Sequence, residues 1–167
     1  VVSINGLLVR YRATAGLLTI RKESKHTEES AEPQAVAQVF VTAYERLGVA
    51  NPQQRPLTFA YNGGPGSSAV WLHLGAFGPY RVPLGSDGEP VHAPFELTEN
   101  EHSLLDVTDL LFIDPVSTGW SRPADGQKAE EFHTFDADVE AVAEVIRSWL
   151  GRTNRWLSPK YLAGESY

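Results

Sequence analysis

The chain has 167 residues, of which 42% are hydrophobic and 21% charged, a balance typical of a soluble globular protein of one domain. Its formal net charge of −7 gives no basic surface for a nucleic-acid backbone, and no apolar run is long enough to cross a bilayer. The absence of cysteine excludes disulfides, zinc–thiolate sites and thiol catalysis. We therefore expect a protein that binds neither nucleic acid nor membrane.

The compartment is not fixed by this composition, since many exported proteins also lack disulfides. The sequence begins at Val1 without an initiator Met and without a charged and then apolar leader. A signal peptide that has been removed is compatible with this start. An exported location, periplasmic or secreted, is therefore favoured.

The first part of the chain is expected to form strands. Two apolar and β-branched runs, residues 7–12 and 17–21, are separated by small residues and favour a β-hairpin. The charged segment 22–33 is typical of a surface loop. Period-two alternation over residues 37–44 predicts a strand, and a short apolar run over residues 57–61 predicts a second one.

The middle of the chain is expected to be less regular. The second strand leads directly into the glycine loop NGGPG at residues 62–66. The serines at residues 67–68 are expected to cap a short helix that runs through Leu74 and is broken by the glycines beyond it. Residues 82–103 mix Gly, Pro, Asn and acidic residues without a period, which predicts an irregular surface excursion.

The last part of the chain predicts one helix between two strands. The compact apolar run at residues 110–113 lacks alternation, which favours a parallel strand covered on both faces. Apolar residues recur at steps of three and four between Val139 and Leu150, with acidic residues before them and arginines after them, as in an amphipathic helix. A short apolar run at residues 161–163 then enters the sequence GESY at residues 164–167.

An antiparallel beginning followed by alternating strands and helices predicts the α/β class, with a mixed, mostly parallel central sheet. In such sheets the chemistry lies at the carboxyl ends of the strands. Two glycine-bearing loops, at residues 62–66 and 164–167, follow short apolar strands and are the candidate site.

The sequence GES at residues 164–166 resembles the first half of a nucleophile elbow, although a lone Gly-x-Ser is more often a simple turn. The glycine loop is compatible with a flexible turn, and also with an oxyanion-binding loop whose main chain approaches a reacting carbonyl. In an α/β-hydrolase, one oxyanion donor follows the nucleophile and the other comes from an earlier glycine loop. Tyr167 and Gly64 fit these two positions.

Three motifs together resemble the serine carboxypeptidase family in content, order and spacing: YNGGPGSS at residues 61–68, FIDPVSTGWS at residues 112–121 and GESY at residues 164–167. The resemblance covers residues 39–167 and is greatest to the bacterial branch of the family. It implies an α/β-hydrolase fold and a Ser, Asp, His triad in that chain order, with Ser166 as the nucleophile.

The same resemblance implies that residues 1–167 are the N-terminal portion of a single α/β-hydrolase catalytic domain, truncated at the nucleophile elbow. The missing C-terminal half is then the expected partner and carries the catalytic Asp and His, so residues 1–167 alone are expected to be inactive. The base is accordingly not expected among the five histidines of this chain, which are His26, His73, His92, His102 and His133.

The resemblance also implies how a substrate is held. Its terminal carboxylate is bound by Asn62, the N–H of Gly63 and Glu165. Glu165 has to be protonated for this, because two facing carboxylates repel each other, so acidic working conditions are expected. Two departures from the family pattern weaken this expectation, namely Ala60 in place of a tryptophan and Ala76 in place of a second acid.

The expected activity is that of a serine-type carboxypeptidase, which hydrolyses the C-terminal peptide bond through an acyl-enzyme. The expected substrate is a peptide with a free C-terminal carboxylate, and no cofactor or metal is implied. Two alternatives remain open at this point. One is an acyltransferase that uses an alcohol in place of water, and the other is an inactive member that serves as a binding or structural module.

Overall fold

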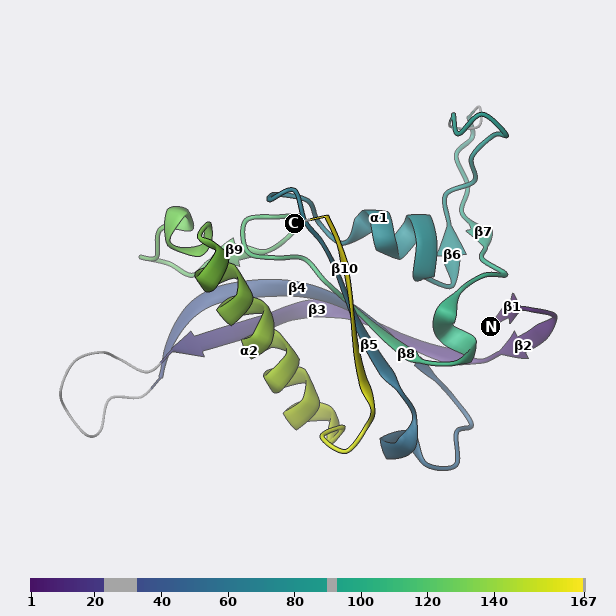
Figure 1. Ribbon diagram of the computed structural model, residues 1–167, viewed down its shortest axis with the longest axis horizontal. Helices are drawn as coiled ribbons and strands as arrows, with labels where there is room; N and C mark the ends of the chain where they lie inside the picture. The colour runs from purple at the N-terminus through teal and green to yellow at the C-terminus, as the bar shows by residue number, and fades with distance from the viewer. Residues whose placement is uncertain (23–32, 90–92, 167) are drawn as a thin grey trace.

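The computed structural model describes residues 1–22, 33–89 and 93–166 (Figure 1). Its N-terminal part differs from the expected hairpin. The short strands β1 (Val2–Ile4) and β2 (Leu7–Val9) pair with each other, and β3 (Tyr11–Lys22) pairs along its whole length with β4 (Gln34–Arg46). The prediction of a turn at residues 13–16 is wrong because this segment lies within β3. Twelve residue pairs with β4 outweigh the local turn tendency of the small residues.

The central sheet has five main strands in the order β10–β5–β8–β4–β3, and a short strand, β9, that pairs with β4. The new members are β5 (Leu57–Asn62), β8 (Asp109–Ile113), β9 (Arg122–Pro123) and β10 (Lys160–Glu165). Strands β10, β5 and β8 are parallel, whereas β4 is antiparallel to both β8 and β3. This mixed sheet confirms the predicted α/β class and agrees with the expected α/β-hydrolase fold, although within the described residues only β10, β5 and β8 form its parallel part.

The helix after the glycine loop is longer than expected. It begins as α1 (Val70–Leu72) and continues as a π-helical turn (His73–Phe77), so Gly75 does not end it. Its N-cap is Ala69, which makes no side-chain capping bond, so the expected serine cap is wrong. Residues 82–103, as far as they are described, contain only the short strand β7 (Thr98–Glu99), which pairs with β6 (Tyr80–Arg81). Residues 23–32 of the predicted charged loop and residues 90–92 of the predicted excursion lie outside the described residues.

The predicted amphipathic helix is confirmed as α2 (Phe135–Thr153). Its N-cap is Thr134, whose side chain accepts a hydrogen bond from the N–H of Ala137 at 3.3 Å. Its C-cap is Asn154 in the left-handed conformation, with a φ of 53°. Both caps satisfy backbone groups that the helix leaves unpaired at its ends. No helix within the described residues has the length and hydropathy needed to cross a membrane.

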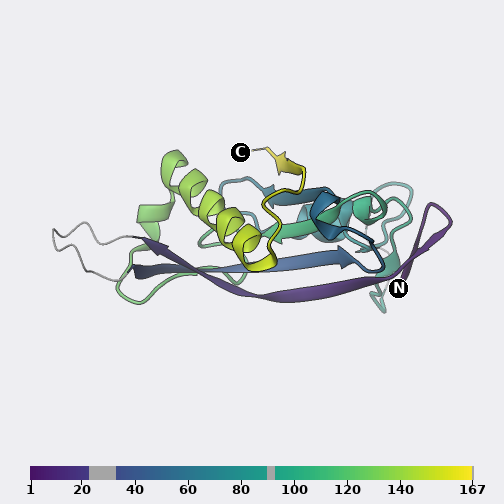
Figure 2. The same cartoon turned by 90° about the horizontal axis from the view of Figure 1, so that it is seen from below.

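The sheet has a hydrophobic core on each of its faces. On one face, α2 packs against the sheet through Ala141, Val145, Trp149 and Leu150, and it lies across β3 and β4 (Figures 1 and 2). On the other face, the hairpin β1–β2 and the segment around α1 cover a second cluster. Strand β8 supplies side chains to both clusters, Leu111 to the first and Phe112 to the second. Its burial on both faces confirms the expectation of a central parallel strand.

A buried ion network closes the amino-terminal edge of the parallel strands. Asp109, the first residue of β8, lies 2.8 Å from Arg55 and 2.7 Å from Arg155. Arg155 also donates to the side chain of Ser158 and to the C=O of Arg55. The two glycine-bearing loops lie at the opposite, carboxyl edge of the same strands.

Candidate active site

Strands β5 and β10 bring the two glycine-bearing loops together. The strands are parallel neighbours, with Gly164 opposite Tyr61 and Glu165 opposite Asn62. The glycine loop and the predicted nucleophile therefore follow adjacent strands at the same edge of the sheet. This is the position at which open α/β sheets bind their ligands.

The turn after β10 has the backbone conformation of a nucleophile elbow. Ser166 follows the last residue of the strand and has a φ of 68°, a backbone angle that residues other than Gly rarely adopt. Backbone strain of this kind costs about 1–3 kcal/mol and is typical of functional sites. A Cβ at Gly164 would lie 3.1 Å from the ring of Tyr61, so a small residue is favoured before the turn. Tyr167, the predicted second oxyanion donor, lies outside the described residues.

The glycine loop has a conformation that requires glycine. Gly64 has a φ of 121°, and a Cβ at this position would lie only 2.9 Å from the backbone N of Gly66. The N–H of Ser67 donates to the C=O of Gly63 at 3.0 Å and closes the loop. A tightly turned main chain without side chains can approach a reacting carbonyl group closely.

Asn62 and Glu165, two of the residues predicted to hold a substrate carboxylate, contact each other. The side-chain amide of Asn62 donates to a carboxylate oxygen of Glu165 at 3.2 Å. The amide oxygen of Asn62 accepts from the N–H of Leu72 at 3.2 Å, which fixes the orientation of a side chain that is only 2% exposed. Glu165 is exposed. A buried amide therefore holds an accessible carboxyl group beside the glycine loop.

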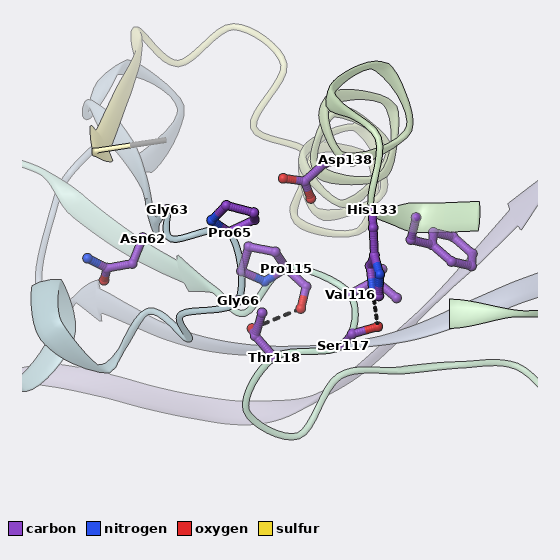
Figure 3. A pocket seen from close by; sticks show the side chains of 11 residues that line it. Asn62, Gly63, Pro65, Gly66, Pro115, Val116, Ser117, Thr118, His133 and Asp138 are labelled. Atoms are coloured by element: carbon purple, nitrogen blue, oxygen red, sulfur yellow. Dashed lines mark hydrogen bonds between the residues drawn. The ribbon is translucent and has the colours of Figure 1, made fainter. Parts of the chain in front are cut away.

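A pocket of about 210 Å³ lies beside the glycine loop, and Asn62 is one of the residues that line it (Figure 3). It is bounded by Gly63, Pro65 and Gly66, by the loop after β8, and by the start of α2. In it, His133 lies 3.0 Å from the hydroxyl of Ser117, and Asp138 points from α2 toward the side formed by Pro65. Burial raises the pKa of Asp138, and the nearby His133 partly offsets this.

Sequence reasoning missed this second set of polar residues. Ser117 lies in the second family motif, so the motif was a signal that the loop borders the site. His133 and Asp138 carried no such signal, because only the packing of α2 brings them to the loop after β8. Ser117 has a φ of 73°, a conformation that indicates a further strained turn at this edge of the sheet.

The other described histidines lie in different surroundings. The ring of His73 is 2.7 Å from the hydroxyl of Tyr44 and is stacked on Phe112 at 4.5 Å, and burial lowers its pKa to about 4. His102 is exposed beside Glu101. His26 and His92 lie outside the described residues. Within the described residues, no group of three or more His, Asp or Glu side chains could hold a metal ion.

Comparison with known proteins identifies the family. The family model for serine carboxypeptidases, peptidase S10, matches residues 21–167. The chain belongs to the serine carboxypeptidase family. The described residues of the three motifs that suggested this membership lie at the carboxyl edge of the sheet, so family and geometry agree.

Individual relatives are moderately similar to this serine carboxypeptidase family member. A pheromone-processing carboxypeptidase of Saccharomyces cerevisiae, KEX1, is 31% identical over 161 residues, which are 92% of this chain and 20% of that protein. Serine carboxypeptidase-like 7 of Arabidopsis thaliana is 29% identical over 127 residues, which are 70% of this chain and 26% of that protein.

The fold agrees with a solved structure of the family. The crystal structure described as that of Kex1(delta)p, a prohormone-processing carboxypeptidase from Saccharomyces cerevisiae, has a TM-score of 0.64 and is 27% identical. The match covers 93% of this chain and 31% of that chain. The present chain thus spans about a fifth to a third of the length of these relatives. Since they are fungal and plant proteins, they do not confirm the predicted bacterial branch.

Proposed function

We propose that the protein is a serine-type carboxypeptidase in which Ser166 attacks the C-terminal peptide bond of a substrate. The observation that carries the proposal is the pairing of β5 with β10, which brings the Asn62–Glu165 contact beside the strained turn at Ser166. One loop supplies a nucleophile and the other supplies main-chain donors. Family membership makes this chemistry the first expectation for the site.

In this proposal the hydroxyl oxygen of Ser166 forms a bond to the carbonyl carbon and its proton passes to a histidine. The N–H groups of Gly64 and Tyr167 donate to the oxyanion that develops. The leaving amine takes the proton as the C–N bond breaks, and water then hydrolyses the acyl-enzyme. The histidine and its orienting Asp come from residues beyond Tyr167 in the full-length protein.

We propose that Asn62, Glu165 and the N–H of Gly63 bind the C-terminal carboxylate of the substrate and so select peptides with a free C-terminus. Asn62 donates through its amide, and Glu165 donates only in its acid form. Acidic working conditions follow, and they fit the exported location that the sequence favours. The absence of an acid at position 76 leaves Glu165 as the one carboxyl group assigned to this role.

The remainder of the protein is proposed to complete the domain by covering an apolar groove of about 320 Å³ between α2 and β10. The groove is lined by Leu162, which is 65% exposed, and by Val139, which is 53% exposed. Burial of this apolar surface would stabilise the folded protein by about 25 cal/mol for each Å² removed from water. The length of the relatives supports the presence of such a segment.

The test is to label the full-length protein with a fluorophosphonate and to locate the adduct by peptide mass analysis. We expect one adduct, on Ser166, and loss of both the adduct and the hydrolysis of a blocked dipeptide in S166A. The matched control is S117A, because Ser117 lies 3.0 Å from His133 in the described part of the chain. An adduct on Ser117 that persists in S166A would contradict the proposal.

The same assay separates the proposed reaction from acyl transfer. With a blocked dipeptide and an added alcohol, a carboxypeptidase releases mainly the free acid, whereas an acyltransferase forms mainly the ester. Predominant ester formation would reassign the acceptor without changing the role of Ser166. Absence of both products from folded protein would indicate an inactive member of the family.

A further inference from the structure

Asp114 directly follows β8, and its side chain lies between two loops at the carboxyl edge of the sheet. One carboxylate oxygen accepts a hydrogen bond from the backbone N–H of Ala69 at 2.8 Å. The backbone N–H of Trp120 provides a second hydrogen bond to this carboxyl group. Asp114 therefore links the segment that follows the glycine loop to the loop that follows β8.

The loop after β8 is wound closely around the Asp114 carboxylate. Gly119 has a φ of 48°, and a Cβ at this position would overlap the carboxylate and lie 3.1 Å from the Cβ of Ser68. Residue 119 therefore has to be glycine for the two loops to approach each other.

The backbone of Asp114 is also held in place. Its N–H donates to the C=O of Phe40 in β4 at 3.1 Å. Its C=O accepts from the hydroxyl of Ser121 at 2.7 Å, and this hydroxyl accepts from the N–H of Phe40 at 2.8 Å. Ser121 is fully buried. The carboxylate thus projects from a part of the main chain that is fixed to the sheet.

Burial raises the pKa of Asp114, and the hydrogen bonds from Ala69 and Trp120 partly offset this. Hydrogen bonds to an ionised acceptor are shorter and stronger than those between neutral groups. The partly buried carboxylate of Asp114 therefore fixes the positions of the N–H groups of Ala69 and Trp120, from which it accepts hydrogen bonds. The surroundings therefore fit a role in holding the loops more than a role in contact with substrate.

We propose that Asp114 is a positioning residue that fixes the glycine loop relative to Ser166. The first end of the loop is held by the pairing of β5, and the segment that follows its far end is held by the bond from Ala69 to Asp114. Stabilisation of an oxyanion depends on where its donors lie, and small displacements lower the rate strongly. The inference rests on the proposed function, in which Gly64 is one of the donors.

The test compares D114N with the parent in the full-length protein. Asn has nearly the same shape but offers one acceptor oxygen where Asp offers two. We expect the kcat for a blocked dipeptide, per site titrated with a fluorophosphonate, to fall about 10-fold to 100-fold, since a 1 Å misplacement costs up to about 100-fold. The KM should change less than about threefold. Affinity for a peptide aldehyde, which places an oxyanion in the site, should fall in parallel with kcat/KM.

Two further variants keep the test decisive. D125N is the matched control because Asp125 is exposed on a nearby turn, and it should leave kcat per site unchanged. S121A keeps the carboxylate but removes the bond to the C=O of Asp114, and it should lower kcat per site in the same way by a smaller factor. It replaces D114N as the test variant where D114N does not fold.

The outcomes separate this inference from the proposed function. A parent protein that folds but neither hydrolyses the dipeptide nor reacts at Ser166 would overturn the proposed function, and this role with it. An active parent with unchanged kcat per site in D114N and S121A would overturn the role of Asp114 alone. A lower melting temperature or a lower fraction of titratable sites, with unchanged kcat per site, would also overturn this role. A purely structural residue gives that result.

Discussion

Replacing His73 by Gln should make the stability of the full-length protein less dependent on pH between about 6.5 and 4. His73 lies in the π-helical turn after the glycine loop, with its ring beside the hydroxyl of Tyr44 and stacked on Phe112. Burial lowers the pKa of this imidazole from 6.5 to about 4. Gln keeps a side chain that can hydrogen-bond to Tyr44 but does not titrate in this range.

The sign and the size of the effect follow from the pKa difference. Below pH 6.5 the unfolded chain takes up a proton at His73, whereas the folded protein does so only near pH 4. The contribution of His73 to stability is therefore complete above pH 6.5, is lost as the pH falls toward 4, and does not change further below that. One pKa unit corresponds to about 1.4 kcal/mol, so the loss by pH 4.5 is about 2–3 kcal/mol.

The assay is urea denaturation, followed by intrinsic fluorescence, at several pH values from 7.5 to 4.5. The parent should lose about 2–3 kcal/mol more than H73Q over this range, whatever constant offset the substitution causes. H102Q is the matched control because His102 is exposed, and its pH profile should run parallel to that of the parent. Parallel profiles for the parent and H73Q would refute the reasoning and show that the imidazole is hydrated in the folded protein.

Two further substitutions test the site and the buried ion network. In E165Q the amide donates a hydrogen bond at every pH, so hydrolysis of peptide acids should persist to higher pH than in the parent; an unchanged pH–rate profile would exclude contact between Glu165 and the substrate carboxylate. R155M leaves Asp109 buried with Arg55 as its remaining ionic partner and should destabilise the protein by about 3–5 kcal/mol in urea denaturation. The exposed R152M is its control, and equal losses in both variants would show that the network adds nothing.

Elements with a strong local pattern could be predicted from the sequence. Helix α2 could be predicted from the spacing of its apolar residues. Its first turn carries the predicted acidic residues and its last turn carries Arg152. The buried strands β5 and β8 follow from compact apolar runs beside glycine and proline. These elements share one property, which is that neighbouring residues alone specify them.

Elements that depend on distant partners could not be predicted in this way. The small residues 13–16 favour a turn locally, but Ala13 and Gly16 lie opposite Tyr44 and Val41, and pairing with β4 keeps the strand extended. Gly75 likewise lies inside a helical segment that continues to Phe77. In both places tertiary contacts outweigh local propensity.

The candidate site shows the same division. The motifs indicated Asn62, Glu165 and Ser166 through their resemblance to a family, and the structure brings the first two into contact. The link from Ala69 to Asp114 had no sequence signal, because it joins residues 45 positions apart through a single side chain. Contacts of this kind depend on packing, and no local pattern encodes them.

Because β5 pairs with β10, the geometry of the site does not depend on the length of the chain that connects these two strands. Asn62 and Glu165 are 103 positions apart in sequence, yet adjacent strands keep their backbones about 4.8 Å apart. An insertion in the excursion between β6 and β7 leaves this spacing unchanged. One extra residue within β5 or β10 instead turns every following side chain to the opposite face of the sheet. Variation in length should therefore accumulate in the connections, while both strands keep their residue count.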